Sequence, residues 1–102
     1  MTENNKPAYE LSDIKSAFDA PGKLRMTFSA QQGQLSLNFN DMDVVKAIQA
    51  LTDNDFYKSM SPKRPGFTAW QDVYKSTFKG VELYIKFQVN HKKELILSFK
   101  EK

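Results

Sequence analysis

The residues best suited to chemistry are lysines, glutamines and one tyrosine in the last third of the chain. Three segments there alternate polar and apolar residues, and their polar positions hold Gln71, Lys75, Tyr84, Lys86, Gln88 and Lys100. Lysine binds phosphate as a point charge, whereas tyrosine and glutamine can orient a phosphate or contact a base. Together these residue types indicate a surface for a polyanion such as RNA or DNA.

The charge distribution favours the same interpretation. The formal net charge of the 102 residues is +3, and it is uneven. Residues 1–51 hold five Lys and Arg against six acids, a net charge of −1, whereas residues 52–102 hold ten against six, a net charge of +4. A basic excess gathered on one face suits a nucleic acid.

The composition excludes several other kinds of site. There is no cysteine, which excludes a disulfide framework, a thiolate zinc site and a cysteine nucleophile. The one histidine, His91, excludes a pair of histidines acting as acid and base, and it does not favour a histidine-rich metal site. No run approaches the length of a membrane span, and residues 1–10 lack the apolar core of a signal peptide. We therefore expect a cytosolic protein that binds no metal and no membrane.

The first half of the chain is predicted to be mainly helical. A short helix is expected within "ELSDIKSAFDAPG", with Ser12 as its N-cap and Pro21-Gly22 as its end. Alternation over residues 23–28 predicts a strand, whereas Gly33 leaves the segment after it ambiguous between helix and loop. The clearest helix is expected over "NDMDVVKAIQAL", capped by Asn40 or Asp41, with an apolar stripe made of Met42, Val45, Ile48 and Leu51.

The second half is predicted to form an antiparallel meander of three strands joined by short turns. The apolar positions must face the core, so a slip of one residue would turn every side chain to the wrong face. The turn lengths then place Tyr84 opposite Lys75 and either directly opposite or diagonal to Lys100, which gathers the polar side chains on one face. The same register puts Trp70 on the core face and makes Asp72 a polar misfit there. The predicted fold class is α+β, with N-terminal helices on one face of a mostly antiparallel sheet.

Four ordered motifs also resemble a known family. They are "DFYKSM" (55–60), "WQDVY" (70–74), "LYIKF" (83–87) and "LSFKEK" (97–102), and together they resemble the MqsR family of motility quorum-sensing regulator toxins. The resemblance implies one RelE-like toxin domain over residues 1–102, a metal-independent endoribonuclease that cleaves mRNA without a cofactor, and a cognate antitoxin partner in the cytoplasm. Carried over by position, the family's catalytic residues fall on Lys58, Gln71, Tyr84 and Lys100.

RNA can be cleaved without metal because its own 2′-OH can attack the adjacent phosphate, giving a 2′,3′-cyclic phosphate and a 5′-OH. Lys58 and Lys100 suit the stabilisation of the extra negative charge. A neighbouring cation would depress a lysine's pKa, so that one of the two could act as general acid, and Tyr84 could position or deprotonate the 2′-OH. Gln71 can hold a phosphate or a base edge.

Two other functions remain open on the sequence alone. The same basic face, with Lys75, Lys86 and Gln88, would also serve a non-catalytic RNA- or DNA-binding module. A protein-interaction domain that meets an acidic partner is the second alternative. Lys63 and Arg64 suit a solvated loop and an RNA guide equally well.

Overall fold

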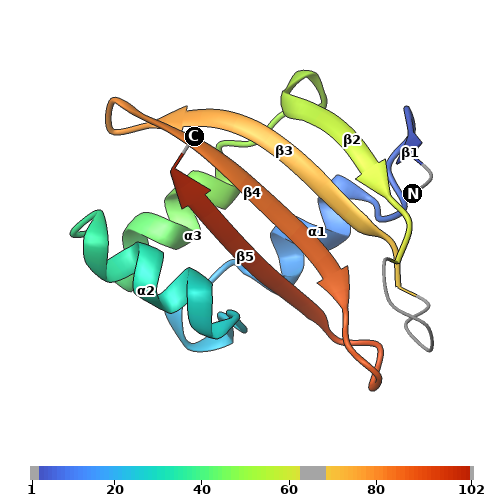
Figure 1. The fold of residues 1–102 in the computed structure, drawn as a ribbon. Coiled ribbons are helices and arrows are strands. Elements are labelled where there is room, and N and C mark those ends of the chain that lie inside the picture. The colour runs from blue at the N-terminus through green and yellow to red at the C-terminus, as the bar shows by residue number, and fades with distance from the viewer. Residues whose placement is uncertain (1–2, 63–68, 102) are drawn as a thin grey trace.

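The computed structural model describes residues 3–62 and 69–101. Its centre is one antiparallel sheet with the strand order β1-β2-β3-β4-β5, and the helices lie on one side of it (Figure 1). The strands are β1 (Glu3–Asn4), β2 (Phe56–Met60), β3 (Gln71–Phe78), β4 (Val81–Val89) and β5 (Leu95–Glu101). The α-helices are α1 (Leu11–Ala17), α2 (Phe28–Ser36) and α3 (Asp41–Gln49), and single 3₁₀ turns cover Pro21–Lys23 and Asp53–Asp55. The α+β prediction is therefore confirmed, whereas a RelE-like kinship stays a prediction.

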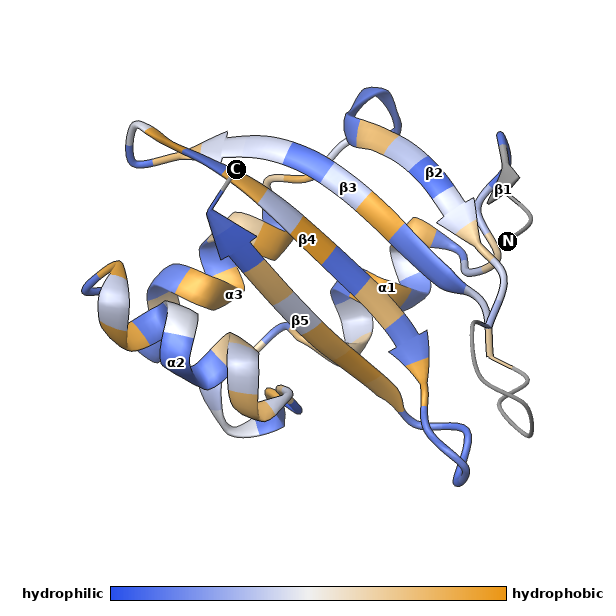
Figure 2. Ribbon diagram, viewed as in Figure 1, coloured by the Kyte–Doolittle hydropathy of each residue, from blue (hydrophilic) through white to orange (hydrophobic). Residues whose placement is uncertain are grey.

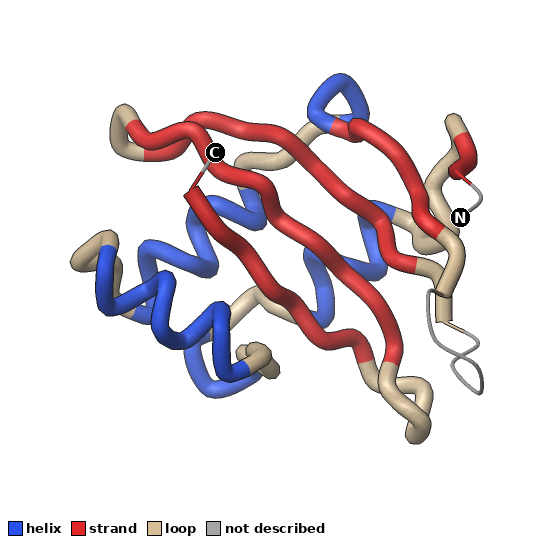
Figure 3. Tube along the Cα trace, in the orientation of Figure 1, coloured by secondary structure: helices blue, strands red, loops and turns tan. Residues whose placement is uncertain are grey.

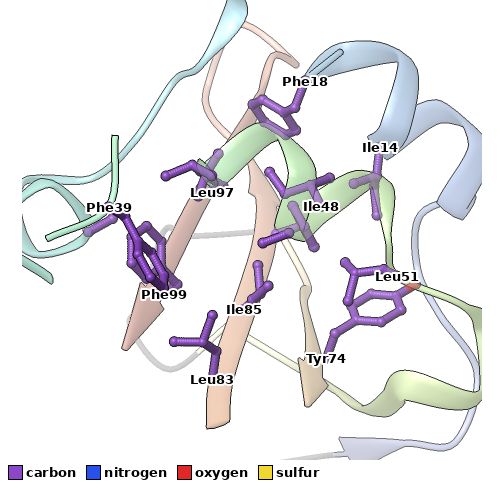
Figure 4. Close-up of a cluster of buried hydrophobic side chains, with 14 residues drawn as sticks. Ile14, Phe18, Phe39, Ile48, Leu51, Tyr74, Leu83, Ile85, Leu97 and Phe99 are labelled. Carbon is purple, nitrogen blue, oxygen red and sulfur yellow. The ribbon is translucent and has the colours of Figure 1, made fainter. Parts of the chain in front are cut away.

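The core lies between the helices and the inner face of the sheet. Ile14 of α1 and Ile48 of α3 meet Tyr74, Ile85 and Leu97 from three strands in one buried cluster (Figure 4). Hydropathy alternates along these strands, as expected for a sheet that is covered on one face only (Figure 2). Apolar burial on the inner face leaves the other face, called here the outer face, available to polar side chains. None of the helices in the described ranges is long and apolar enough to cross a bilayer.

Helix α3 begins where the sequence predicts. Asn40 is its N-cap, and its side chain accepts a hydrogen bond from the Asp43 N–H at 2.8 Å, while Asp43 accepts one from the Asn40 N–H at 2.9 Å. This reciprocal pair is a capping box. The predicted apolar stripe is correct at Val45, Ile48 and Leu51 but wrong at Met42, which is exposed. The buried positions of α3 lie on the side of the helix that Met42 does not share.

Two predictions upstream of α3 are wrong. Ser12 is not an N-cap, because α1 already begins at Leu11, and Glu10 occupies the cap position without a side-chain hydrogen bond. The predicted strand over residues 23–28 is a single parallel bridge between Met26 and Leu97. The extended segment ends at Thr27, which is the N-cap of α2. The Thr27 hydroxyl accepts a hydrogen bond from the Ala30 N–H at 3.1 Å.

The predicted meander is confirmed with its register. Val81 pairs with Phe78, and Tyr84 pairs with Lys75 on one side and Lys100 on the other. Figure 3 shows the three long strands as neighbours, joined by two short connections. Strand β2 was not predicted, and it extends the sheet on the far side of β3.

The polar misfit Asp72 anchors the N-terminal segment to the sheet. Its carboxylate is fully buried and accepts hydrogen bonds from the Ala8 and Tyr9 N–H groups at 2.9 and 3.0 Å. It also accepts one from the Ser59 hydroxyl at 2.7 Å. Trp70 was predicted in the core, but it is only half-buried, and its carbonyl accepts the Tyr9 hydroxyl at 2.6 Å.

Candidate active site

The centre of the outer face is a row of three residues across three strands. Tyr84 of β4 lies between Lys75 of β3 and Lys100 of β5, each at a directly paired position. Paired residues on neighbouring strands are about 5 Å apart, so both lysines are within side-chain reach of the tyrosine. Tyr84 and Lys75 are half-buried, and Lys100 is exposed. The row therefore presents two ammonium groups beside one phenol.

A second row lies two residues along the strands, about 7 Å away. It runs from Lys58 in β2 through Val73 in β3 to Lys86 in β4 and Ser98 in β5. Val73 is only 3% exposed although it lies on the outer face, so side chains of that face cover it. Lys58 and Lys86 thus stand on either side of a small apolar floor.

Lys58 reaches the outer face through an irregularity in β2. Phe56 pairs with Tyr74 and Lys58 with Val73, so the register shifts by one residue between them. Such a β-bulge places two residues opposite one, which turns Tyr57 and Lys58 to the same face. Regular alternation would have pointed Lys58 into the core. After the bulge Ser59 points inward and meets Asp72.

Tyr57 belongs to this face, and sequence reasoning missed it. Its side chain is 46% exposed, and its ring centroid lies 6.3 Å from that of Tyr84. Lys75 Nζ lies 3.7 Å from the centre of the Tyr57 ring, and Lys58 Nζ lies 5.1 Å from it. These are cation–π distances. The adjacent Tyr57 and Lys58 of "DFYKSM" were the available signal, but regular alternation would have placed them on opposite faces.

The remaining predicted site residues lie farther from Tyr84. Gln71 and Gln88 are each four residues along their strands from Lys75 and Tyr84, about 13 Å away. Gln71 pairs with Met60 of β2, two residues along β3 from Val73, which belongs to the second row. Lys63 and Arg64 lie outside the described residues. The structure therefore brings Lys75, Tyr84 and Lys100 closest together and sets Gln71 at the far end of the face.

Tyr74 lies on the inner face of the sheet and, unlike the tyrosines on the outer face, is buried. Burial, with smaller contributions from the charges of Asp72 and Asp53, raises the pKa of Tyr74 to about 12. Tyr74 therefore keeps its proton at neutral pH and is out of reach of a substrate. On the described part of the outer face, Tyr57 and Tyr84 are tyrosines that a ligand can touch. Within residues 3–62 and 69–101, no group of three or more acidic or histidine side chains is arranged to hold a metal ion.

Comparison with known proteins identifies the family. Residues 6–101 match the family model described as "Motility quorum-sensing regulator, toxin of MqsA". The chain is also 39% identical over 102 residues to the mRNA interferase toxin MqsR of Escherichia coli (strain K12), an alignment that covers 98% of this chain and 99% of that protein. Both matches span nearly the whole chain, including all of the outer face. The chain therefore belongs to the motility quorum-sensing regulator (MqsR) toxin family.

Proposed function

We propose that this protein is a sequence-selective endoribonuclease toxin that cleaves mRNA without a metal ion. The observation that carries the proposal is the row Lys75–Tyr84–Lys100 on an open sheet face, in a chain similar to a protein named an mRNA interferase toxin. Like charges placed together on a sheet cost stability. A polyanionic substrate accounts for their presence, and a phenol beside them supplies a group that can move or hold a proton.

The reaction uses the nucleophile that RNA itself carries. The 2′-oxygen attacks the adjacent phosphorus, its proton leaves to a base, and the bond from phosphorus to the 5′-oxygen breaks as that oxygen takes a proton. The products are a 2′,3′-cyclic phosphate and a 5′-OH. Tyr84 orients the 2′-OH or, in its phenolate form, accepts the 2′-OH proton, and Lys100 stabilises the phosphorane and protonates the leaving oxygen.

Lys58 and Gln71 act on the other side of the scissile phosphate. Lys58 stands three strands from Lys100, about 14 Å across the sheet, and also two residues, about 7 Å, along it, so the RNA backbone would run between them. Lys58 then neutralises a phosphate oxygen, while Gln71 holds a flanking phosphate or base edge. Lys75, Lys86 and Gln88 line the same path, and we propose that Lys63 and Arg64 also bind the RNA.

Tyr57 supplies a stacking surface beside the reacting group. Its ring lies next to Tyr84, and the ammonium of Lys75 lies against it. An exposed aromatic ring in a basic surface binds single-stranded RNA because every base has a π-face. A base stacked on Tyr57 would bring the neighbouring ribose and its 2′-OH towards Tyr84.

A cognate antitoxin would inhibit this nuclease activity in the cell. The family description reads "toxin of MqsA", and we propose that an antitoxin of that kind binds this chain. Both substrate and partner would be met in the cytoplasm. No cofactor is needed, since the attacking group belongs to the RNA.

The decisive test is product chemistry on a matched pair of substrates. A short RNA and the same RNA with a 2′-deoxy nucleotide at the cut site are incubated with the protein in excess chelator, and the product ends are read by mass spectrometry. We expect a 2′,3′-cyclic phosphate from the first substrate and no cleavage of the second. Cleavage that stops with chelator and returns with magnesium or zinc would contradict the mechanism, and binding without cleavage would indicate a nucleic-acid-binding module.

The residue roles are tested by combining substitutions. Lys58→Ala, Tyr84→Ala and Lys100→Ala should each remove most turnover, and the triple variant should lose little more than the worst single variant. Groups that act as one unit show such non-additivity. Additive losses would mean that the three residues act independently. Gln71→Ala should be milder, because an uncharged amide stabilises less of the phosphorane charge.

A further inference from the structure

A groove runs between α2 and the edge strand β5, next to the proposed active site. Its volume is about 260 Å³, and it is lined by Ser29, Gly33 and Ser36 from α2 and by Lys86, Ser98 and Lys100 from the sheet. Figure 1 shows α2 beside β5, at the margin of the sheet. Lys100 belongs both to the groove and to the row around Tyr84. The groove therefore continues the basic outer face past the sheet's last strand.

Close packing of α2 against β5 sets the width of the groove. A Cβ at Gly33 would lie 3.4 Å from the backbone oxygen of Phe99, so the helix approaches the strand to near contact there. Ser29 and Ser36 lie on the same side of the helix as Gly33, since positions i, i+4 and i+7 share a face. Their short side chains leave the space above this contact open and line it with hydroxyl groups.

The groove is lined by charges of both signs. Lys86 and Lys100 supply positive charge on the side of the outer face, and Glu101 supplies a carboxylate at the end of β5. A phosphate alone would be attracted by the lysines and repelled by Glu101. A nucleotide can bind both the lysines and Glu101, because its phosphate is anionic and its base can present N–H donors to a carboxylate.

We propose that this groove binds the nucleoside that flanks the scissile phosphate on the Lys100 side. The base enters between α2 and β5, the serine hydroxyls contact its edge, and Glu101 accepts hydrogen bonds from its amino group. The volume is just below the range of about 300 Å³ at which small-molecule pockets begin, so it suits one nucleoside rather than a run of bases. The inference rests on the proposed function and assigns part of its sequence preference.

The carboxylate predicts which bases are favoured. Adenine, cytosine and guanine carry an exocyclic amino group that can donate to Glu101, whereas uracil presents an N–H flanked by two acceptor oxygens that repel a carboxylate. We therefore expect a base with an amino group at this position to be preferred over uracil by about tenfold to a hundredfold. Glu101→Gln should reduce this preference to a few-fold, because an amide can donate as well as accept.

The test blocks the groove without substituting any of the proposed catalytic residues. Ser36→Phe places a ring in the groove, and Gln31→Phe places the same ring at an exposed position on the opposite side of α2. Thermal unfolding checks that both variants keep the fold. Binding of a short RNA with a 2′-deoxy cut site is measured by fluorescence anisotropy, with an amino-bearing base or uracil at the flanking position.

We expect Ser36→Phe to weaken binding at least tenfold and to abolish the base preference, while Gln31→Phe matches the unaltered protein. Equal affinity and equal preference in the two phenylalanine variants would overturn the groove assignment. An unchanged base preference in Glu101→Gln would also overturn the groove assignment. This variant leaves the groove open, so it provides the test if Ser36→Phe does not fold. The binding readout needs no cleavage, so failure of the nuclease proposal would be seen separately, as an RNA that is bound but not cut.

Discussion

Replacing Lys100 by methionine isolates the chemical role of this lysine from its role in the fold. Lys100 is exposed, and its pairing with Tyr84 in the sheet is made by the backbone. Methionine keeps a long unbranched side chain and leaves that backbone pairing intact. The free energy of unfolding should therefore change by no more than about 0.5 kcal/mol, as for other surface substitutions.

The expected loss of activity is much larger than the loss of stability. If Lys100 stabilises the phosphorane, its removal resembles the loss of one oxyanion-hole donor, which lowers kcat by about 10²–10³-fold, or about 2.7–4 kcal/mol. Loss of one phosphate contact should also reduce the slope of log binding constant against log salt by about 0.7 for a single strand. Lys100→Arg should restore part of the activity, since the charge returns but the guanidinium gives up a proton less readily.

Lys92→Met is the matched control. It makes the same change in net charge at an exposed position in the β4–β5 connection, away from the row around Tyr84. Cleavage of a fluorescent RNA is followed for both variants at several salt concentrations, with kcat and KM determined separately. If Lys100→Met stays within threefold of Lys92→Met in kcat, the lysine only adds to the general basic field, and the proposed site around Tyr84 is wrong.

Two further predictions concern the bulge and the end of the β3–β4 hairpin. Tyr57→Ala should weaken RNA binding by about 1–3 kcal/mol through loss of one stacked base, while Tyr57→Phe should bind normally; equal affinities would show that the ring does not stack. Hydrogen bonds from Lys79 and from the Asn40 N–H lower the pKa of Asp43 below its usual value. The ionised Asp43 therefore adds to the free energy of unfolding. This addition is complete above the unfolded pKa of about 3.9 and disappears as pH falls through the lower folded pKa. Urea unfolding should therefore show Lys79→Met to be less stable than the unaltered protein at pH 6 and to approach it in strong acid, and a constant gap would refute the link.

The sequence by itself determined the meander and the main row of the candidate site. Apolar alternation in the strands allows only registers that bury Leu83, Ile85 and Leu97, and two short turns select among those registers. Tyr84 therefore had to lie opposite Lys75 and next to Lys100, and the structure shows the register in which it pairs directly with Lys100. The same kind of local information predicted α3, because Asn40 and its capping partner are only three residues apart.

Contacts between distant segments decided the rest. Tyr57 and Lys58 share a face only because β2 pairs with β3 through a bulge, and nothing within β2 itself requires that pairing. Asp72 is a polar residue on the core face, and hydrogen bonds donated by Ala8, Tyr9 and Ser59 from distant segments satisfy its buried carboxylate. Each of these depends on hydrogen bonds between residues far apart in the sequence, which local propensity does not encode.

The segment before α2 shows the same division. Its alternation favours a strand, but Thr27 can cap a helix, and packing of that helix against β5 selects the second choice. The groove beside Lys100 follows from this docking and from no local pattern. Local sequence sets what each segment can become, and the burial gained by distant partners decides which of those possibilities is the most stable.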